Sequence, residues 1–114
     1  MQYMCLIYVA PDTQADAPDE AISAEYGALA QNAARQGVMK GGDQLADATS
    51  ATTVRVRNGK RVVSDGPFAE TKEVLVGYFA FECPSIDEAI EWAAKIPGAR
   101  YGSIEVRPIV DRGN

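Results

Sequence analysis

The sequence predicts one α+β domain over residues 1–114, built as a ferredoxin-like βαββαβ sheet with a β-hairpin inserted after the second strand. Three observations support this fold class. Strand-like stretches rich in β-branched and aromatic residues alternate with two stretches of helical periodicity. The pair Asn58-Gly59 separates two further strand-like stretches, which is a strong hairpin signal. A chain of 114 residues can form one substantial core and has little room for a second.

The first half of the chain predicts a strand, a helix and a short second strand. Residues 2–9 are apolar on both alternating sides, so this strand should be covered on both faces. We expect the helix to begin near Pro18, with Asp16 as a candidate cap, and to end at Gly37. Residues 38–45 are predicted to form the second strand. The apolar stripe of the helix consists of Ile22, Tyr26, Leu29 and Ala33.

The hairpin is predicted from residues 53–57 and 60–64. Because the two strands are joined by a two-residue turn, their side chains alternate between two faces in a defined register. We expect the basic face to be solvated, with an anion-binding ribbon as the alternative. One face carries the valines Val54, Val56 and Val63, and the other carries the basic residues Arg55, Arg57 and Lys60.

Nine residues from Asp65 to Glu73, with the sequence DGPFAETKE, follow the hairpin. Gly66 can adopt backbone angles that other residues avoid, and Pro67 fixes its own φ, so the stretch should contain a bend. We expect Phe68 to anchor this bend by burying its ring. The charged side chains left for solvent or a ligand are Asp65, Glu70, Lys72 and Glu73.

The second half predicts a long strand over residues 74–83, a helix, and a last strand over residues 103–109. The helix should start at Pro84-Ser85, with Ser85 as its cap, and stop at Pro97-Gly98. Its buried stripe is expected to contain Ile86, Ala89, Ile90, Ala93 and Ile96, flanked by Trp92. Alternation places Leu75, Phe79, Phe81 and Cys83 on one face of the long strand, and Val76, Tyr78, Ala80 and Glu82 on the other.

One face of the predicted sheet has no partner within the chain. Two helices can cover only one face of a four-stranded sheet. The other face is expected to carry Tyr8, Leu6 or Met4, Val76, Tyr78 and Ala80. Left uncovered, these side chains would form an exposed apolar patch of several hundred Å². We therefore predict a homodimer in which two copies pack sheet against sheet.

The composition excludes several classes of function. A net charge of −5 argues against nucleic acid as the main partner. The chain has no histidine, which excludes imidazole metal ligands and Ser-His or Cys-His pairs, and we predict neither a metal nor a cofactor. Without a basic leader or a run of about 20 apolar residues, no membrane association and a cytoplasmic location are expected. Cys5 and Cys83 are predicted to be buried free thiols rather than a disulfide.

The stretch DGPFAETKE resembles the motif after which the DGPF branch of the YCII-related family is named. The resemblance implies a dimeric α+β barrel with a cleft between its sheets and a largely unassigned biochemistry. Related barrels include muconolactone isomerases and a few cofactor-free enzymes that act on small aromatic or lactone acids. The His-Asp pair proposed as catalytic in the YCII branch cannot be carried over, because histidine is absent. Further similar stretches are Tyr3-Met4, residues 51–55, Gly77-Tyr78, residues 96–100 and residues 102–108.

Candidate site residues come from this stretch and from the sheet. Asp65 is a candidate general base, and the alternative is a structural carboxylate that accepts backbone N–H bonds in the turn. Lys72 is a candidate for holding an acidic ligand, or else a solvated loop charge. Glu105 and Arg107 share one face of the last strand. If that face is the inward one, we expect an internal salt bridge between them, with a ligand site in which Arg107 binds a carboxylate as the alternative. The aromatic candidates for contact with a ligand are Tyr8, Tyr78 and Phe68, and packing at a dimer interface is the alternative for the two tyrosines.

These residues leave two functions open. The first is a non-catalytic dimer that binds a small acidic or aromatic organic ligand in a cleft beside the DGPF motif. The second is a cofactor-independent isomerase or lyase, in which Asp65 moves a proton and Arg107 or Lys72 holds a carboxylate. The sequence does not decide whether the protein is an enzyme.

Overall fold

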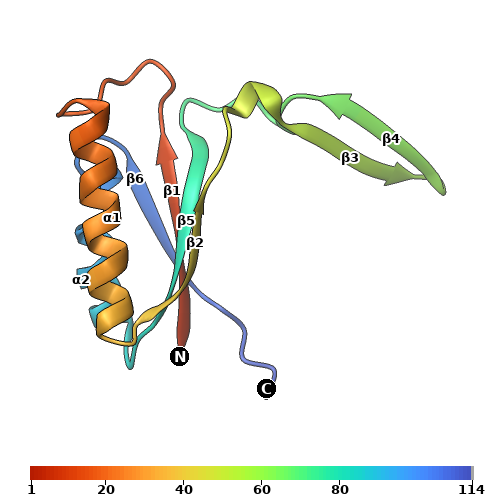
Figure 1. The fold of residues 1–114 in the computed structure, drawn as a ribbon. Helices are drawn as coiled ribbons and strands as arrows, with labels where there is room; N and C mark the ends of the chain where they lie inside the picture. The colour runs from red at the N-terminus through yellow and green to blue at the C-terminus, as the bar shows by residue number, and fades with distance from the viewer. Residues whose placement is uncertain (114) are drawn as a thin grey trace.

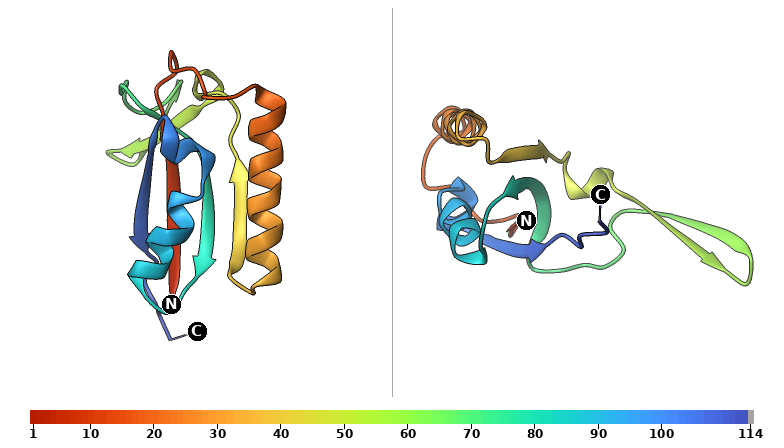
Figure 2. Two further views of the ribbon diagram at one scale, coloured as in Figure 1. Left: turned by 90° about the vertical axis from the view of Figure 1, so that its left-hand side faces the viewer. Right: turned by 90° about the horizontal axis from the view of Figure 1, so that it is seen from below.

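The computed structural model describes residues 1–113 and has the predicted ferredoxin-like α+β fold. Four antiparallel strands form one sheet in the order β2-β5-β1-β6. Both helices cover the same face of this sheet (Figure 1; Figure 2, left). The strands are β1 (Gln2–Val9), β2 (Met39–Gln44), β5 (Val74–Glu82) and β6 (Ser103–Pro108), and the helices are α1 (Asp19–Arg35) and α2 (Ile86–Ala94). No helix within residues 1–113 is long and apolar enough to cross a membrane.

The core lies between the helices and the sheet face that they cover. Phe81 is fully buried, and its ring lies 5.5 Å from that of Phe79 and 5.7 Å from that of Trp92, measured between centroids. Cys5 and Cys83 are buried free thiols, as predicted, and burial raises the pKa of the Cys5 thiol to about 11. The buried core residues are Tyr3, Cys5, Ile7, Leu29, Ala33, Phe79, Phe81, Cys83, Ala89, Trp92, Ala93 and Ile96.

Helix α1 follows the predicted apolar stripe, whereas its predicted cap is wrong. Leu29 and Ala33 are buried and Tyr26 packs against the core. The residue before the helix is Pro18, which makes no side-chain cap, and the Asp16 carboxylate binds Arg100 instead. The backbone nitrogens of the first turn therefore lack a side-chain partner, and Asp19 and Glu20 place negative charge at this positive end of the helix dipole.

Helix α2 has the predicted cap but a narrower buried face. The Ser85 hydroxyl accepts a hydrogen bond from the backbone N–H of Glu88 at 3.3 Å. Ile86 and Ile90 are 42% and 51% exposed, so their predicted burial is wrong. Successive residues of a helix are turned by about 100°, and the large Trp92 ring faces the core. The two isoleucines are consequently left at the margin of the buried face.

A β-bulge in the pairing of β1 with β5 corrects the predicted faces of two residues. Ile7 pairs with Gly77, but the next residue, Tyr8, pairs with Leu75, so Val76 is the extra residue. Val76 packs against the core, and Leu75 lies beside Tyr8 on the opposite face. Strict alternation along the sequence assigned these two side chains the other way round.

The predicted hairpin forms a separate two-stranded sheet, which we call the arm. It consists of β3 (Thr52–Arg57) and β4 (Lys60–Asp65), and the predicted register is confirmed by the pairs Arg57 with Lys60 and Val54 with Val63. Asn58 and Gly59 both have positive φ angles, 53° and 74°, as a tight hairpin turn of this twist requires. The arm projects away from the body on the side opposite to the helices (Figure 1; Figure 2, right).

This projection makes the single chain unusually extended. Its radius of gyration is 16.0 Å, whereas a compact domain of this length is expected to have about 13 Å. Its exposed surface is 7933 Å², roughly 1,900 Å² more than the area expected for a compact monomer of 12.2 kDa. Much of the surface that folding normally buries therefore remains exposed in one copy.

Candidate functional site

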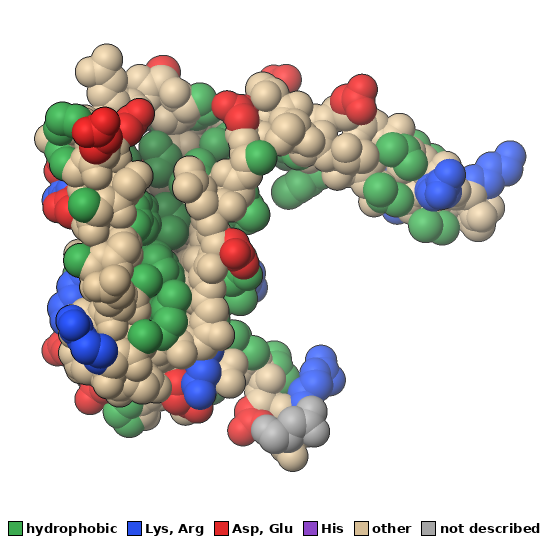
Figure 3. Space-filling view, viewed as in Figure 1, with side chains coloured by type: hydrophobic (Ala, Val, Ile, Leu, Met, Phe, Trp, Pro, Cys, Tyr) green, Lys and Arg blue, Asp and Glu red, His purple; other side chains and the backbone are tan. Residues whose placement is uncertain are grey.

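The sheet face opposite the helices, which we call the open face, carries the tyrosines and the charged pair predicted from the sequence. Leu6 pairs with Tyr78 on one side and with Glu105 on the other, and Met4 pairs with Arg107. Figure 3 shows apolar side chains along the hollow between the sheet and the arm. The open face consists of Met4, Leu6, Tyr8, Asp43, Leu75, Tyr78, Ala80, Glu105 and Arg107.

The β2 side of the open face holds a polar pair that sequence reasoning missed in part. Asp43 of β2 pairs with Tyr78 of β5, and the Tyr78 hydroxyl donates a 2.7 Å hydrogen bond to Asp43 Oδ2. This bond to a carboxylate raises the pKa of Tyr78, so the phenol keeps its proton. Asp43 could have been identified only from the register of β2 against β5, because that register decides which side chain lies opposite Tyr78. The sequence of β2 alone does not contain this information.

Glu105 and Arg107 lie at the β6 edge of the open face, and the salt bridge predicted between them is wrong. Both residues are exposed, and the ion pairs of residues 1–113 do not join them. Side chains two positions apart on a strand stand side by side, and in water nothing requires these two charges to pair. The Arg107 guanidinium remains available for another acidic group.

Asp65 ends β4 at the base of the arm, and its carboxylate does not hold the turn as expected. Gly66 has a φ of 91°, and its N–H donates to the carbonyl of Ala51 at 2.7 Å. The Thr53 hydroxyl donates to the Gly66 carbonyl at 2.8 Å. Within residues 1–113 no hydrogen bond to the Asp65 carboxylate is present, so backbone groups and Thr53 stabilise this bend.

Phe68 contradicts the prediction of a buried anchor. Its side chain is 78% exposed, in the segment between β4 and β5. Arg55 makes a long contact of 3.5 Å to the Phe68 carbonyl, which ties the segment to β3. Glu70 and Lys72 are exposed as well, in keeping with solvated loop charges. The predicted site residues thus form two groups: Asp65, Phe68 and Lys72 at the end of β4 and in the segment that leads to β5, and Tyr8, Tyr78, Glu105 and Arg107 on the open face.

Two hollows on the surface of the single chain lie away from both groups. One, of about 290 Å³, lies between Met1, Glu82 and residues 109–112. The other, of about 270 Å³, is an apolar groove beside α2 that includes Ile90 and Val106. Neither contains a residue of the DGPF stretch, so neither is the cleft predicted beside that motif.

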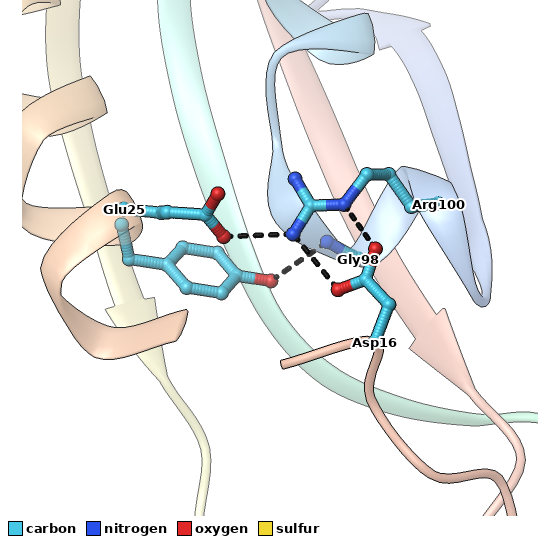
Figure 4. Close-up of polar contacts among 5 residues, drawn as sticks. Asp16, Glu25, Gly98 and Arg100 are labelled. Carbon is cyan, nitrogen blue, oxygen red and sulfur yellow. Dashed lines mark hydrogen bonds and ion pairs between the residues drawn. The ribbon is translucent and has the colours of Figure 1, made fainter. Parts of the chain in front are cut away.

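A charged cluster outside the predicted site connects three segments near the start of α1 (Figure 4). Arg100 Nη2 donates to Asp16 Oδ1 at 3.0 Å and to Glu25 Oε2 at 2.7 Å. Next to it, the hydroxyl of Tyr26 accepts a bond from the N–H of Gly98 at 3.3 Å. The Arg100 guanidinium lies between the two carboxylates and offsets their mutual repulsion, which leaves the cluster with one net negative charge. The cluster holds the loop before α1, α1 itself and the turn at 97–100 together, which is a structural role.

This cluster predicts a pH dependence of stability. Hydrogen bonding to Arg100 lowers the pKa of Asp16 below its ordinary value of 3.8, so folding favours the ionised carboxylate. The stabilisation is complete above that ordinary value and is lost as the pH falls through the lower pKa of the folded state.

We expect Asp16→Asn to be less stable than the wild type at pH 7 and to lose less stability on acidification. Urea unfolding at pH 7 and pH 3 measures this difference. Asp12→Asn, in the same exposed loop, is the control, and an equal acid loss in all three proteins would contradict the assignment.

Comparison with known proteins agrees with the fold and identifies the family. Residues 1–112 match the family model of the YCII-related domain. The chain is also similar to an uncharacterized protein of Rhizobium meliloti (strain 1021), with 38% identity over 93 residues that cover 80% of this chain and 75% of that protein. The match extends across both helices, the sheet and the arm. The chain therefore belongs to the YCII-related family.

Proposed function

We propose that the protein is a homodimeric α+β barrel that binds a small acidic or aromatic organic ligand between two open faces, beside the DGPF stretch. The observation that carries this proposal is the roughly 1,900 Å² of surface that one chain exposes beyond the expectation for a compact monomer. A permanent homodimer buries at least about 1,000 Å² on each subunit, so the excess is of the right size. The two buried free thiols support a reducing compartment such as the cytoplasm.

The chemistry of the open face supports this class of ligand. Arg107 offers a planar guanidinium that fits a carboxylate with two parallel hydrogen bonds. Tyr8 and Tyr78 offer ring faces to an aromatic group. Because the Tyr78 hydroxyl already donates its hydrogen bond to Asp43, its oxygen is left to accept a hydrogen bond from a ligand hydroxyl. Packing a second sheet about 10 Å away would enclose these groups and exclude much of the water.

Thermal denaturation in the presence of hydroxylated aromatic acids and lactones tests the proposal. We expect at least one acid to raise the melting temperature, and Arg107→Ala to abolish the shift. Arg35→Ala removes the same charge from the end of α1, on the helical side, and should keep the shift. The proposal fails if no compound stabilises the protein or if Arg107→Ala behaves like Arg35→Ala.

A cofactor-independent isomerase or lyase is the second candidate. It is favoured by one observation: the exposed Asp65 carboxylate at the head of the DGPF stretch is not engaged by the turn and is free to meet a ligand. Consumption of a stabilising compound, lost in Asp65→Asn while binding is retained, supports catalysis. Stabilisation without consumption supports a binding protein.

A further inference from the structure

We infer that the arm clasps a second copy of this chain and brings the DGPF stretch of one copy to the rim of the partner's open face, so that two chains build each ligand site. The inference rests on the sheet-to-sheet dimer proposed above and adds a contribution from the partner to the site. Three independent features of the arm support it: its exposed apolar side chains, its direction and length, and its charge.

The arm exposes apolar side chains that the rest of its own chain does not cover. Val54, Val56 and Val63 share one face of the arm and are 54–63% exposed, and Phe68 at the base is 78% exposed. A two-stranded hairpin is marginally stable in water unless its apolar face packs against another layer. Valine and phenylalanine each contribute about 1.5–3 kcal/mol when they become fully buried, so covering this surface stabilises the arm substantially.

The direction and length of the arm suit a partner that lies on the open face. The arm extends over the hollow that the open face borders (Figures 1 and 3). Each of its strands has six residues, which span about 20 Å. A partner sheet stacked on the open face would lie about 10 Å away. Because the arm is longer than this spacing, it would extend past the edge of the partner sheet and contact the side of the partner subunit. The base of the arm, with Asp65 and Phe68, then lies level with the space between the two sheets.

The charge of the arm favours a second copy over other occupants. Residues 52–64 contain four of the 11 basic residues of the chain and none of its 16 acidic residues. The remainder of the chain is therefore strongly acidic, and the arm of one copy is attracted to the body of another. The open face itself contributes two of these acidic side chains, Asp43 and Glu105.

The composite site follows from this placement. Asp65 and Phe68 come from the base of one arm and Lys72 from the segment that follows it, whereas Tyr78 and Arg107 come from the open face of the other copy. This arrangement brings together two groups of predicted site residues that lie on different elements of one chain. It also explains why the DGPF stretch has an exposed aromatic ring: Phe68 becomes buried only when the partner is present.

Photocrosslinking tests the clasp directly. A benzoylphenylalanine placed at Val56, on the valine face, is expected to join two chains covalently, whereas the same residue at Arg57, on the opposite face, is the matched control. In a sample mixed from isotopically light and heavy chains, the crosslinked peptides should pair light with heavy. Crosslinks confined to one chain, or none, in a protein whose solution mass is that of a dimer would overturn the clasp and leave the sheet-to-sheet dimer standing. A solution mass of one chain would overturn both.

The fluorescence of Phe68→Trp tests the burial of the base. Trp92 is 6% exposed in the core and supplies a constant background. We expect blue-shifted emission at position 68 that resists acrylamide quenching in the dimer, and a red shift with strong quenching when Leu6→Glu is added to separate the subunits. Emission at position 68 that is equally quenched in both proteins would overturn the inference even if the dimer itself is confirmed.

Discussion

Replacing Leu6 by glutamate is expected to convert the homodimer into a folded monomer. Leu6 lies at the centre of the open face, between Tyr78 and Glu105, and has no role in the core behind the sheet. In the proposed dimer the new carboxylate would be removed from water beside Tyr78 and Glu105, and the charge of Glu105 would repel it. Burying such a charge without full compensation costs about 3 kcal/mol or more, so the dissociation constant should rise by at least about 100-fold.

Sedimentation velocity over a range of protein concentrations measures this change, with far-ultraviolet circular dichroism to confirm that the variant is folded. Gln31→Glu introduces the same charge at an exposed position of α1, on the helical side, and should leave the dimer unchanged. If Leu6→Glu dissociates no more readily than Gln31→Glu, the open face is not the subunit interface.

Replacing Phe81 by alanine is expected to cause a large loss of folding stability. Phe81 is fully buried and lies between the rings of Phe79 and Trp92. Its removal leaves a cavity and breaks both aromatic contacts, and substitutions of this kind cost about 3–5 kcal/mol. The neighbouring rings of Phe79 and Trp92 belong to β5 and α2, which are held by their own backbone hydrogen bonds. We therefore expect them to fill the cavity only in part.

Urea unfolding followed by circular dichroism measures this loss, at one fixed protein concentration because the stability of a dimer depends on it. Val110→Ala is the control: Val110 is 71% exposed, and its truncation should change the free energy of unfolding by less than about 0.5 kcal/mol. A difference between the two variants below about 1 kcal/mol would contradict the placement of Phe81 at the centre of the core.

The fold could be predicted from the sequence because its signals are local. The stripe that ends at Leu29 and Ala33 requires a helix, and Asn58-Gly59 requires a tight hairpin with one register. The side chains of Tyr8 and Tyr78 followed from simple alternation, which places both on the face opposite to Phe79 and Phe81. Each of these features depends on neighbours within a few residues.

The errors arose where a distant partner decides the outcome. The exchange of Leu75 and Val76 results from a bulge against β1, which alternation along one strand cannot reveal. Asp43 became a site candidate only through its pairing with Tyr78, which is 35 residues away. Phe68 was expected to pack within its own chain, and its 78% exposure shows that no part of that chain covers its ring.

Sedimentation equilibrium of the unmodified protein in dilute, near-neutral buffer tests most directly whether a second copy covers the open face. The mass should be twice 12.2 kDa and should remain so down to micromolar concentration. A well-folded particle of 12.2 kDa under the same conditions would contradict the account.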